Sequence, residues 1–245
     1  MHPVLFNLGP VEVRSYAVFV LLAFVVAGAV RRAELARLGH ARMPGYRWVP
    51  VGALLGAVVG AKLGMLLFEP PEVAAETFAR VLSLDFTGKT VVGGLIGGYL
   101  GVEIAKKAVG ITRSTGDGFA VAVPLAQAVG RVGCLLNGCC YGTPWEGPWA
   151  VSIGGVWRHP TQLYEAGLDL ALAAALWATR WTERPAGHLF RRYLVGYALI
   201  RFATEFVRGD AGHTLGPLTW VQALCLGVAA LFGGLILRGE VRRSP

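Results

Sequence analysis

The chain has 245 residues and is strongly apolar for its length, with 54% hydrophobic residues, 16% charged residues and 34 glycines. Its mean hydropathy is +0.53. This composition excludes an ordinary soluble domain and a disordered chain, and it is typical of a membrane protein. The formal net charge of +8 could by itself indicate binding to nucleic acid or to an acidic membrane surface.

Apolar runs that approach the roughly 20 residues needed to cross a bilayer recur along the whole chain. They lie at 16–29, 48–68, 91–105, 119–136, 163–179, 189–206 and 218–237. They predict an all-α integral membrane protein with about seven transmembrane helices, in a single polytopic domain over residues 1–245. Residues 69–90 and 141–159 are expected to form small outward-facing loops or interfacial segments.

The basic residues are distributed unevenly between the two sides of these runs. Fifteen fall in the loops that follow the first, third, fifth and seventh runs, and five fall on the other side. By the positive-inside rule, the N-terminus lies outside and the C-terminus is cytoplasmic. The positive charge therefore reflects topology, and no nucleic-acid partner is expected.

The first run has small residues near its end, as a cleavable signal would. However, its arginine pair, Arg31 and Arg32, follows the apolar core instead of preceding it. This order favours a retained membrane anchor over a cleaved signal.

Glycines cluster twice in the middle of the chain. Gly93, Gly94, Gly97, Gly98 and Gly101 place small residues on adjoining turns, which favours close helix packing. The second cluster, Gly130, Gly133, Gly138 and Gly142, surrounds Arg131 and Asn137. A permanent charge inside the membrane needs an anionic partner, and exposed backbone N–H groups can add to an anion site. Arg131 is therefore expected to bind an anion, for which a phospholipid phosphate is the obvious candidate.

Two of the later runs carry polar residues at helical spacing. Gln162, Glu165 and Asp169 share one helical face, with His159 one turn earlier. A second stripe consists of Tyr197, Arg201, Glu205 and Arg208. Both stripes must face protein or a wet cavity and not lipid tails. For Arg201 and Glu205 alone a buried structural ion pair is an alternative, but the two stripes together with Arg131 and Lys62 favour a binding site.

The four cysteines do not form a disulfide framework for a chain of this size. Cys139 and Cys140 could be a covalent or redox-sensitive pair, or could bind a soft metal together with His159. We favour a third interpretation, small packing residues, because the sequence does not supply three or four convincing metal ligands. No metal and no cofactor are therefore expected. Cys225 is alone in an apolar run and is expected in the core.

The motifs match a known family along nearly the whole chain. The run Gly130-Arg131-Val-Gly133, with Asn137-Gly138 and Gly142, resembles the signature of the prolipoprotein diacylglyceryl transferases. Further matches are Leu8-Gly-Pro10, Val13-Arg14, Tyr16, Gly93-Gly94-Leu-Ile-Gly97, Asp117, Arg158-His-Pro-Thr-Gln-Leu-Tyr-Glu165, Gly196-Tyr197, Arg201, Glu205-Phe206 and Arg208. The chain departs from the family pattern at Val92, where a histidine is usual, at Cys134 and Cys139, and in its short outer segment 141–157.

The resemblance implies a multi-pass enzyme of the bacterial inner membrane. Its partners would be phosphatidylglycerol as the lipid donor, the lipobox cysteine of a prolipoprotein signal peptide as the acceptor, and the bilayer itself. It would move diacylglyceryl to the thiol and release glycerol 1-phosphate. On this basis the expected catalytic residues are Arg131, Arg201, His159 and Glu205. The expected substrate-binding residues are Tyr16, Gly93, Gly94, Asn137, Gly138, Gln162, Tyr164, Glu165, Tyr197 and Arg208.

Two other functions are compatible with the same residues. One is a paralogous phospholipid headgroup transferase with a different acceptor, which the departures at Val92 and the cysteines would suit. The other is a non-enzymatic lipid-binding or transport protein, for which the short glycine-interrupted runs give some support.

Overall fold

The structure, a computed structural model, describes residues 1–9, 11–68, 91–182, 184–210 and 214–241. The expected outward-facing segment 69–90 lies outside these described residues. The chain divides into two compact units, unit 1 with residues 1–37 and 114–245, and unit 2 with residues 38–113. That the whole chain is one polytopic domain stays a prediction.

A long α-helix lies on each of the predicted apolar runs. These helices are α1 Ser15–Leu38, α2 Trp48–Phe68, α4 Val91–Ala108, α5 Ala122–Asn137, α6 Thr161–Thr179, α7 His188–Glu205 and α8 Trp220–Val241. Two short 3-10 turns, η1 His40–Arg42 and η3 Gly116–Gly118, occur in the connections. Among the described helices, α1 and the Trp220–Arg238 part of α8 are long and apolar enough to cross a membrane, and α2 has a shorter apolar stretch, Trp48–Gly64.

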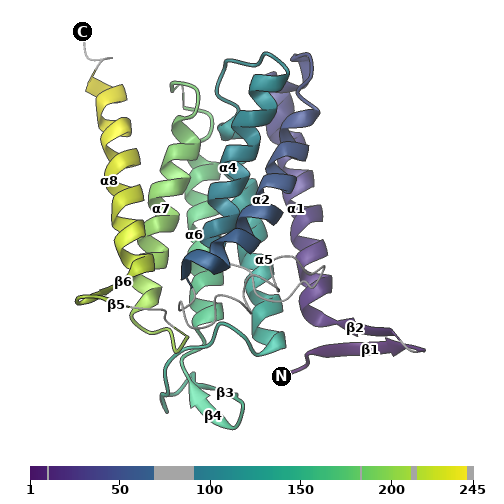
Figure 1. Cartoon of the computed structure of the whole chain (residues 1–245), viewed down its shortest axis with the longest axis vertical. Helices are drawn as coiled ribbons and strands as arrows, with labels where there is room; N and C mark the ends of the chain where they lie inside the picture. Colours follow the sequence, from purple (N-terminus) through teal and green to yellow (C-terminus); the bar gives the residue numbers. More distant parts are fainter. Residues whose placement is uncertain (10, 69–90, 183, 211–213, 242–245) are drawn as a thin grey trace. The chain divides into compact units, whose positions relative to one another are not determined.

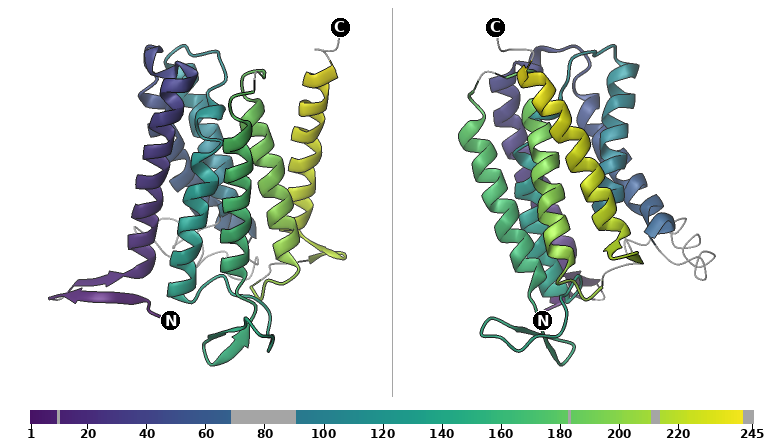
Figure 2. Two further views of the ribbon diagram at one scale, coloured as in Figure 1. Left: turned by 180° about the vertical axis from the view of Figure 1, so that it is seen from behind. Right: turned by 90° about the vertical axis from the view of Figure 1, so that its left-hand side faces the viewer.

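The all-α prediction is incomplete, because unit 1 contains three antiparallel hairpins. They pair β1 Val4–Leu8 with β2 Val11–Arg14, β3 Val151–Ile153 with β4 Val156–Arg158, and β5 Thr214–Leu215 with β6 Leu218–Thr219. The turn between β3 and β4 is Gly154-Gly155, with φ of 62° and 80°. Two-residue hairpin turns require positive φ, which glycine adopts without strain. All three hairpins lie at one end of unit 1, where α6 and α8 begin (Figures 1 and 2).

Unit 1 buries polar residues and exposes apolar ones. Gln162, Glu165 and Asp169 on α6 are each at most 1% exposed, and Glu205 on α7 is 3% exposed. The outer faces of α1, α6 and α8 instead carry large exposed apolar side chains, among them Leu21, Phe24, Val25, Leu168, Leu170, Leu226 and Leu231. This inverted pattern is expected of a protein whose solvent is lipid, because charged groups must face protein there.

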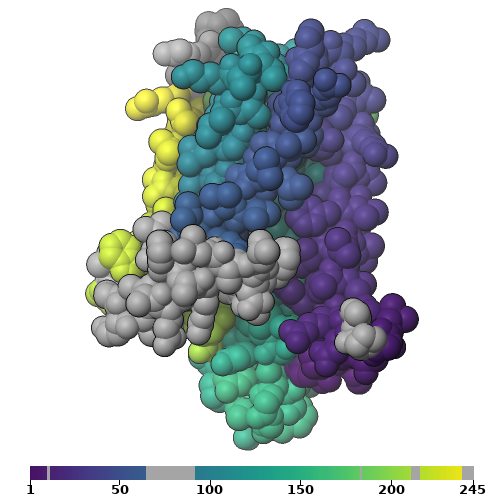
Figure 3. Space-filling view, turned by 45° about the vertical axis from the view of Figure 1, so that its right-hand side comes forward, coloured from purple at the N-terminus to yellow at the C-terminus, as the bar shows by residue number. Residues whose placement is uncertain are grey.

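Unit 2 is built on one close helix pair, α2 and α4, which lie side by side in the space-filling view (Figure 3). A Cβ atom added to Gly97 would overlap the backbone of Gly56 and Gly60, and one added to Gly101 would overlap the carbonyl oxygen of Gly52. The glycines are therefore needed because the two backbones touch, as in other small-residue helix pairs.

Asp117 in η3 holds the start of α7. Its carboxylate accepts hydrogen bonds from the backbone N–H groups of Gly187, at 2.7 Å, and Phe190, at 3.0 Å. Gly187 begins the helix with φ 86° and has no capping side chain of its own. Asp117 thus acts as a helix cap supplied from a distant part of the chain, and its negative charge also suits the helix N-terminus.

Replacing Asp117 by Ala should therefore destabilise unit 1 by about 2 kcal/mol, since two N–H groups lose a charged acceptor. Thermal unfolding of the purified protein in detergent measures the effect. Glu12→Ala is the control, because the ion pair of Glu12 with Arg14 is exposed, at 3.5 Å, and exposed pairs contribute at most about 1 kcal/mol. Equal melting temperatures for the two variants would contradict a capping role.

Candidate functional site

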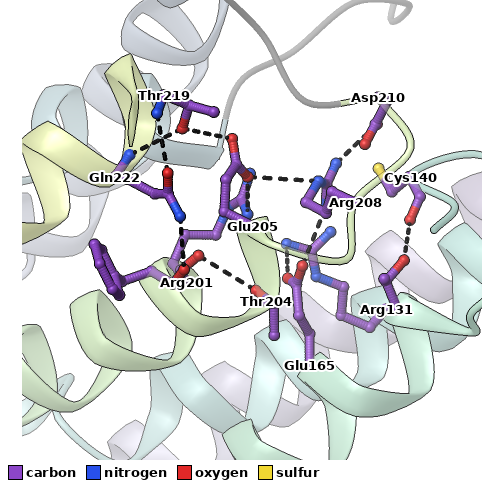
Figure 4. Close-up of polar contacts among 12 residues, drawn as sticks. Arg131, Cys140, Glu165, Arg201, Thr204, Glu205, Arg208, Asp210, Thr219 and Gln222 are labelled. Carbon is purple, nitrogen blue, oxygen red and sulfur yellow. Dashed lines mark hydrogen bonds and ion pairs between the residues drawn. The ribbon is translucent and has the colours of Figure 1, made fainter. Parts of the chain in front are cut away.

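Arg131 and Arg208 meet on one carboxylate. Arg131 on α5 forms an ion pair with Oε2 of Glu165, which lies on α6. Nη1 of Arg208, just beyond the end of α7, donates to Oε1 of the same carboxylate at 3.0 Å (Figure 4). Both oxygens of Glu165 are therefore engaged by guanidinium groups from two other parts of unit 1.

A second carboxylate continues this arrangement. Nη1 of Arg201 lies 2.5 Å from Oε2 of Glu205, one helical turn further along α7. The same oxygen lies 3.9 Å from Nε of Arg208. The other oxygen, Oε1, accepts a hydrogen bond from the hydroxyl of Thr219 at 3.0 Å. Glu205 thereby connects Arg201 to Arg208.

Three guanidinium groups and two glutamates thus form one chain of contacts, which we call the arginine network: Arg131, Glu165, Arg208, Glu205 and Arg201. The side chains of its five members are at most 10% exposed. Asp210 adds a third carboxylate, 2.8 Å from Nη2 of Arg208, and its side chain is more exposed than those of the network. Sequence reasoning expected Arg131 and Arg201 to serve one anion, and the structure places them in one network, with Arg208 between them.

The charge of Arg208 is secured by its neighbours. Burial on its own would lower the pKa of this guanidinium, but the carboxylates of Asp210 and Glu165 raise it above the ordinary value. Arg208 therefore stays charged at every physiological pH, as an anion-binding group must.

Backbone pairing of three segments fixes the position of Arg208. Gly142 forms an isolated antiparallel bridge with Arg208, and its N–H donates to the carbonyl of His159 at 3.1 Å. The N–H of Gly209 donates to the carbonyl of Tyr141 at 2.9 Å. A Cβ atom on Gly142 would lie 2.5 Å from both Cβ and the carbonyl oxygen of His159, so only glycine fits at this crossing.

The predicted catalytic residue His159 lies in an aromatic cluster and not in the arginine network. Its ring stacks on Trp145, with centroids 4.4 Å apart. Its Nδ1 lies 3.1 Å from the hydroxyl of Tyr164, which also accepts a hydrogen bond from Trp149 at 2.7 Å. Trp145 and Trp149 thus hold His159 and Tyr164 in place.

The end of α5 is a tight turn that carries Asn137 and Gly138. Gly138 adopts φ 74°, its N–H donates to the carbonyl of Leu135, and the N–H of Cys139 donates to the carbonyl of Cys134, each at 3.1 Å. These are the two hydrogen bonds of a Schellman cap, which requires the left-handed conformation at this position. The amide of Gln162 on α6 then donates to the carbonyl of Cys139 at 2.8 Å.

The thiol of Cys140 lies in a setting that favours its anion. Hydrogen bonds from the side chains of Cys134 and Cys139 hold the pKa of the Cys140 thiol well below its ordinary value, and the charges of Arg131 and Arg208 act in the same direction.

Tyr16 and Tyr197 border the same region. Tyr16, in the first turn of α1, interacts electrostatically with Arg131 and the nearby cysteines. Tyr197 on α7 does so with Arg131, Glu165 and Arg201. Its hydroxyl is buried and has no hydrogen-bond partner in the described part of the chain.

Gly93 and Gly94 belong to unit 2, whereas the arginine network belongs to unit 1. On α4 they face α2, where a Cβ atom on Gly94 would lie 3.5 Å from Cβ of Ala61. Their predicted contact with substrate stays a prediction.

Sequence reasoning missed three residues of the site: Asp210, Thr219 and Gln222. A sequence signal existed for two of them. Thr219 and Gln222 form a capping box at the start of α8, with Thr219 N–H donating to Gln222 Oε1 at 2.9 Å and Gln222 N–H donating to Thr219 Oγ1 at 3.2 Å. The spacing Thr-x-x-Gln before an apolar run is typical of this cap.

The chain resembles known proteins over nearly its whole length. The sequence profile of the family described as prolipoprotein diacylglyceryl transferase matches residues 3–238. The chain belongs to this family. Its similar relatives include phosphatidylglycerol--prolipoprotein diacylglyceryl transferases of Nitratidesulfovibrio vulgaris, 34% identical over 98% of this chain and 94% of the relative, and of Aromatoleum aromaticum, 33% identical over 99% and 96%. A third, from Geobacter sulfurreducens, is 34% identical over 91% of this chain and 90% of the relative.

Substitutions at two glycines of α4 distinguish a role in helix packing from a role in substrate binding. Gly97→Ala should lower the melting temperature in detergent, because the new methyl group would overlap the rigid backbone of α2. Gly94→Ala should fold like the parent, because its Cβ would make only ordinary contacts, at 3.5 Å. A loss of transferase activity in a stable Gly94→Ala protein would then support substrate contact, whereas full activity would remove Gly94 from the substrate-binding residues.

Proposed function

We propose that this chain transfers diacylglyceryl from phosphatidylglycerol to the lipobox cysteine of prolipoproteins and releases glycerol 1-phosphate. Two findings support the proposal: the family match over residues 3–238, and the arginine network buried among apolar helices. The network is the observation that carries the chemistry, because three fixed positive charges inside a membrane protein are suited to an anionic lipid headgroup.

The reaction requires one bond to form and one to break. The acceptor thiolate attacks the glyceryl carbon of the donor, a C–S bond forms, and the C–O bond to phosphate breaks. The electron pair of that bond leaves on the phosphate oxygen, so negative charge grows there in the transition state. Guanidinium groups that already point at this oxygen lower the barrier, since no solvent or side chain has to reorganise.

In this proposal Arg131 and Arg201 stabilise the departing phosphate, and Arg208 guides the anionic headgroup to them. Glu165 and Glu205 hold the three guanidinium groups in place until the phosphate shares them. His159, Glu165 and Glu205, or water held by them, are the candidates for accepting the thiol proton. The headgroup and glyceryl moiety are positioned by Tyr16, Gly93, Gly94, Asn137, Gly138, Gln162, Tyr164, Glu165, Tyr197 and Arg208.

We further place the protein in the bacterial inner membrane as a multi-pass protein. Its seven described long helices would all cross the bilayer, with the N-terminus outside. The distribution of basic residues supports this orientation. The arginine network then lies toward the outer leaflet, at the end of unit 1 that carries the hairpins, where the thiol of an exported precursor would arrive.

Reporter fusions test the orientation. A periplasm-active reporter should be active at the N-terminus and in the segment 141–159, and inactive at the C-terminus, because topology follows the loops rich in Lys and Arg. A C-terminal fusion that is active outside would contradict the N-out arrangement.

A reconstituted assay tests the activity. Purified protein in mixed micelles with phosphatidylglycerol receives a lipobox peptide, and both glycerol 1-phosphate and the mass of the peptide are followed. We expect equal release of phosphate and gain of diacylglyceryl, and neither with a peptide whose cysteine is serine. Release without peptide modification would indicate a headgroup transferase with another acceptor, and no release would indicate a lipid carrier.

Substitution of the arginines tests the role of the network. Arg131→Ala and Arg201→Lys should each lower kcat by about 10²-fold or more in a folded protein, because removing one preorganised donor typically has that effect and lysine cannot hold two phosphate oxygens in a fork. Arg14→Lys is the control, since the Arg14 side chain is 65% exposed. An Arg201→Lys protein that runs at the parent rate would contradict bidentate phosphate contact.

A further inference from the structure

Three of the four cysteines meet at the outer end of α5. The sulfur atoms of Cys134, Cys139 and Cys140 lie within 4.8 Å of one another, and none of the three forms a disulfide. Cys134 comes from the last turn of the helix, whereas Cys139 and Cys140 follow the Schellman cap. We call these three residues the cysteine group. The structure thus supplies the third ligand that the sequence did not reveal, and it is Cys134 and not His159.

The spacing of the sulfurs suits a thiophilic metal ion. Zinc binds thiolate sulfur at about 2.3 Å, so three sulfurs around one ion stand roughly 3.8–4.0 Å apart. The cysteine group needs only a small adjustment to reach that geometry. A site built from three thiolates favours soft or borderline cations such as Zn²⁺ over Mg²⁺ or Ca²⁺, which prefer oxygen.

The backbone around the group is held in an unusual conformation. Cys140 has φ 58° and is the non-glycine residue with positive φ in the described part of the chain. Such a conformation costs about 1 kcal/mol or more for a residue with a Cβ, and it persists only where the surroundings enforce it. Here Thr161 donates to the carbonyl of Cys140, and Gln162 to that of Cys139, each at 2.8 Å. Two side chains of α6 thus fix the two carbonyls and with them the direction of the thiols.

The charges near the group also match a metal thiolate. Three thiolates and one Zn²⁺ carry a net charge of −1. Arg131 interacts electrostatically with Cys134 and Cys140, and Arg208 with Cys140. Both guanidinium groups also pair with carboxylates, Arg131 with Glu165 and Arg208 with Glu165 and Asp210, so they would attract the negative complex without neutralising it by themselves.

The group leaves one coordination position open. In the described residues no His, Asp or Glu joins the three sulfurs. Cys134 is buried, whereas Cys139 and Cys140 are partly exposed. Structural zinc sites are closed by four protein ligands, while catalytic ones have three and leave the fourth position to water or substrate.

We propose that Cys134, Cys139 and Cys140 bind one zinc ion, and that its fourth position takes the thiol of the acceptor cysteine. The second half of this proposal rests on the proposed transferase function. Coordination would deprotonate the acceptor thiol, with the proton passing to water at the outer surface. The zinc-bound sulfur then attacks the glyceryl carbon, the C–O bond to phosphate breaks, and glycerol 1-phosphate leaves beside the arginine network.

Metal content tests the first half without any lipid substrate. Protein purified under reducing conditions should contain about one zinc per chain, and Cys134→Ser, Cys139→Ser and Cys140→Ser should each reduce that content at least tenfold. The matched control is Cys225→Ser, because Cys225 is the fourth cysteine and lies on α8. Thermal unfolding identifies variants that have lost their fold. The chelator-stripped parent protein, refilled with Co²⁺, gives an independent reading as sulfur-to-cobalt charge-transfer absorption.

The cobalt protein tests the second half. A lipobox peptide with cysteine should change the cobalt spectrum, and the same peptide with serine should not. A parent protein that holds no zinc and gives no sulfur-to-cobalt absorption would overturn the site. A cobalt spectrum that ignores the cysteine peptide would overturn thiol coordination. Metal binding and a peptide response in a protein that releases no glycerol 1-phosphate would leave the site standing and refute the transferase function instead.

Discussion

The structure depends on buried glutamates that neutralise the charges of three arginines away from water. Arg131, Arg201 and Arg208 stand among apolar helices, where an unpaired guanidinium is costly, and each is held by Glu165 or Glu205. Removing one partner of such a buried pair destabilises the fold far more than replacing both partners with apolar residues, because it leaves one buried charge without a counter-charge. The carboxylates therefore do more than neutralise: they fix where three positive charges point before a phosphate arrives.

The path of the chain brings these charges together from distant parts of the sequence. The Schellman cap at Gly138 ends α5 within two turns of Arg131 and just after Cys134. The crossing at Gly142 ties the segment after α5 to the residues after α7, and Asp117 caps the start of α7. Each of these devices is a local backbone requirement met by a specific residue. The first two explain why glycine stands at positions 138 and 142 of the signature.

Much of this was predictable from the sequence. Hydropathy placed the long helices, and helical spacing put Gln162, Glu165 and Asp169 on one buried face, because both signals are local and periodic. The hairpins were missed, since two- to five-residue strands leave little periodicity, although Gly154-Gly155 is a turn signal. Pairings such as Arg131 with Glu165, and the meeting of Cys134 with Cys139 and Cys140, depend on which elements pack together and on how the chain turns after α5, so neither was read from spacing alone.

The capping box at the start of α8 ties the shape of a helix end to the electrostatics of the arginine network. The hydroxyl oxygen of Thr219 accepts a hydrogen bond from the N–H of Gln222, and the same hydroxyl donates to Glu205. Glu205 in turn forms the ion pair with Arg201. Fraying of the first turn of α8 would therefore withdraw a hydrogen bond from that carboxylate and loosen its guanidinium partner. Any lateral displacement of this helix, for instance to admit a two-chained lipid, would therefore change how firmly the Arg201 side chain is held.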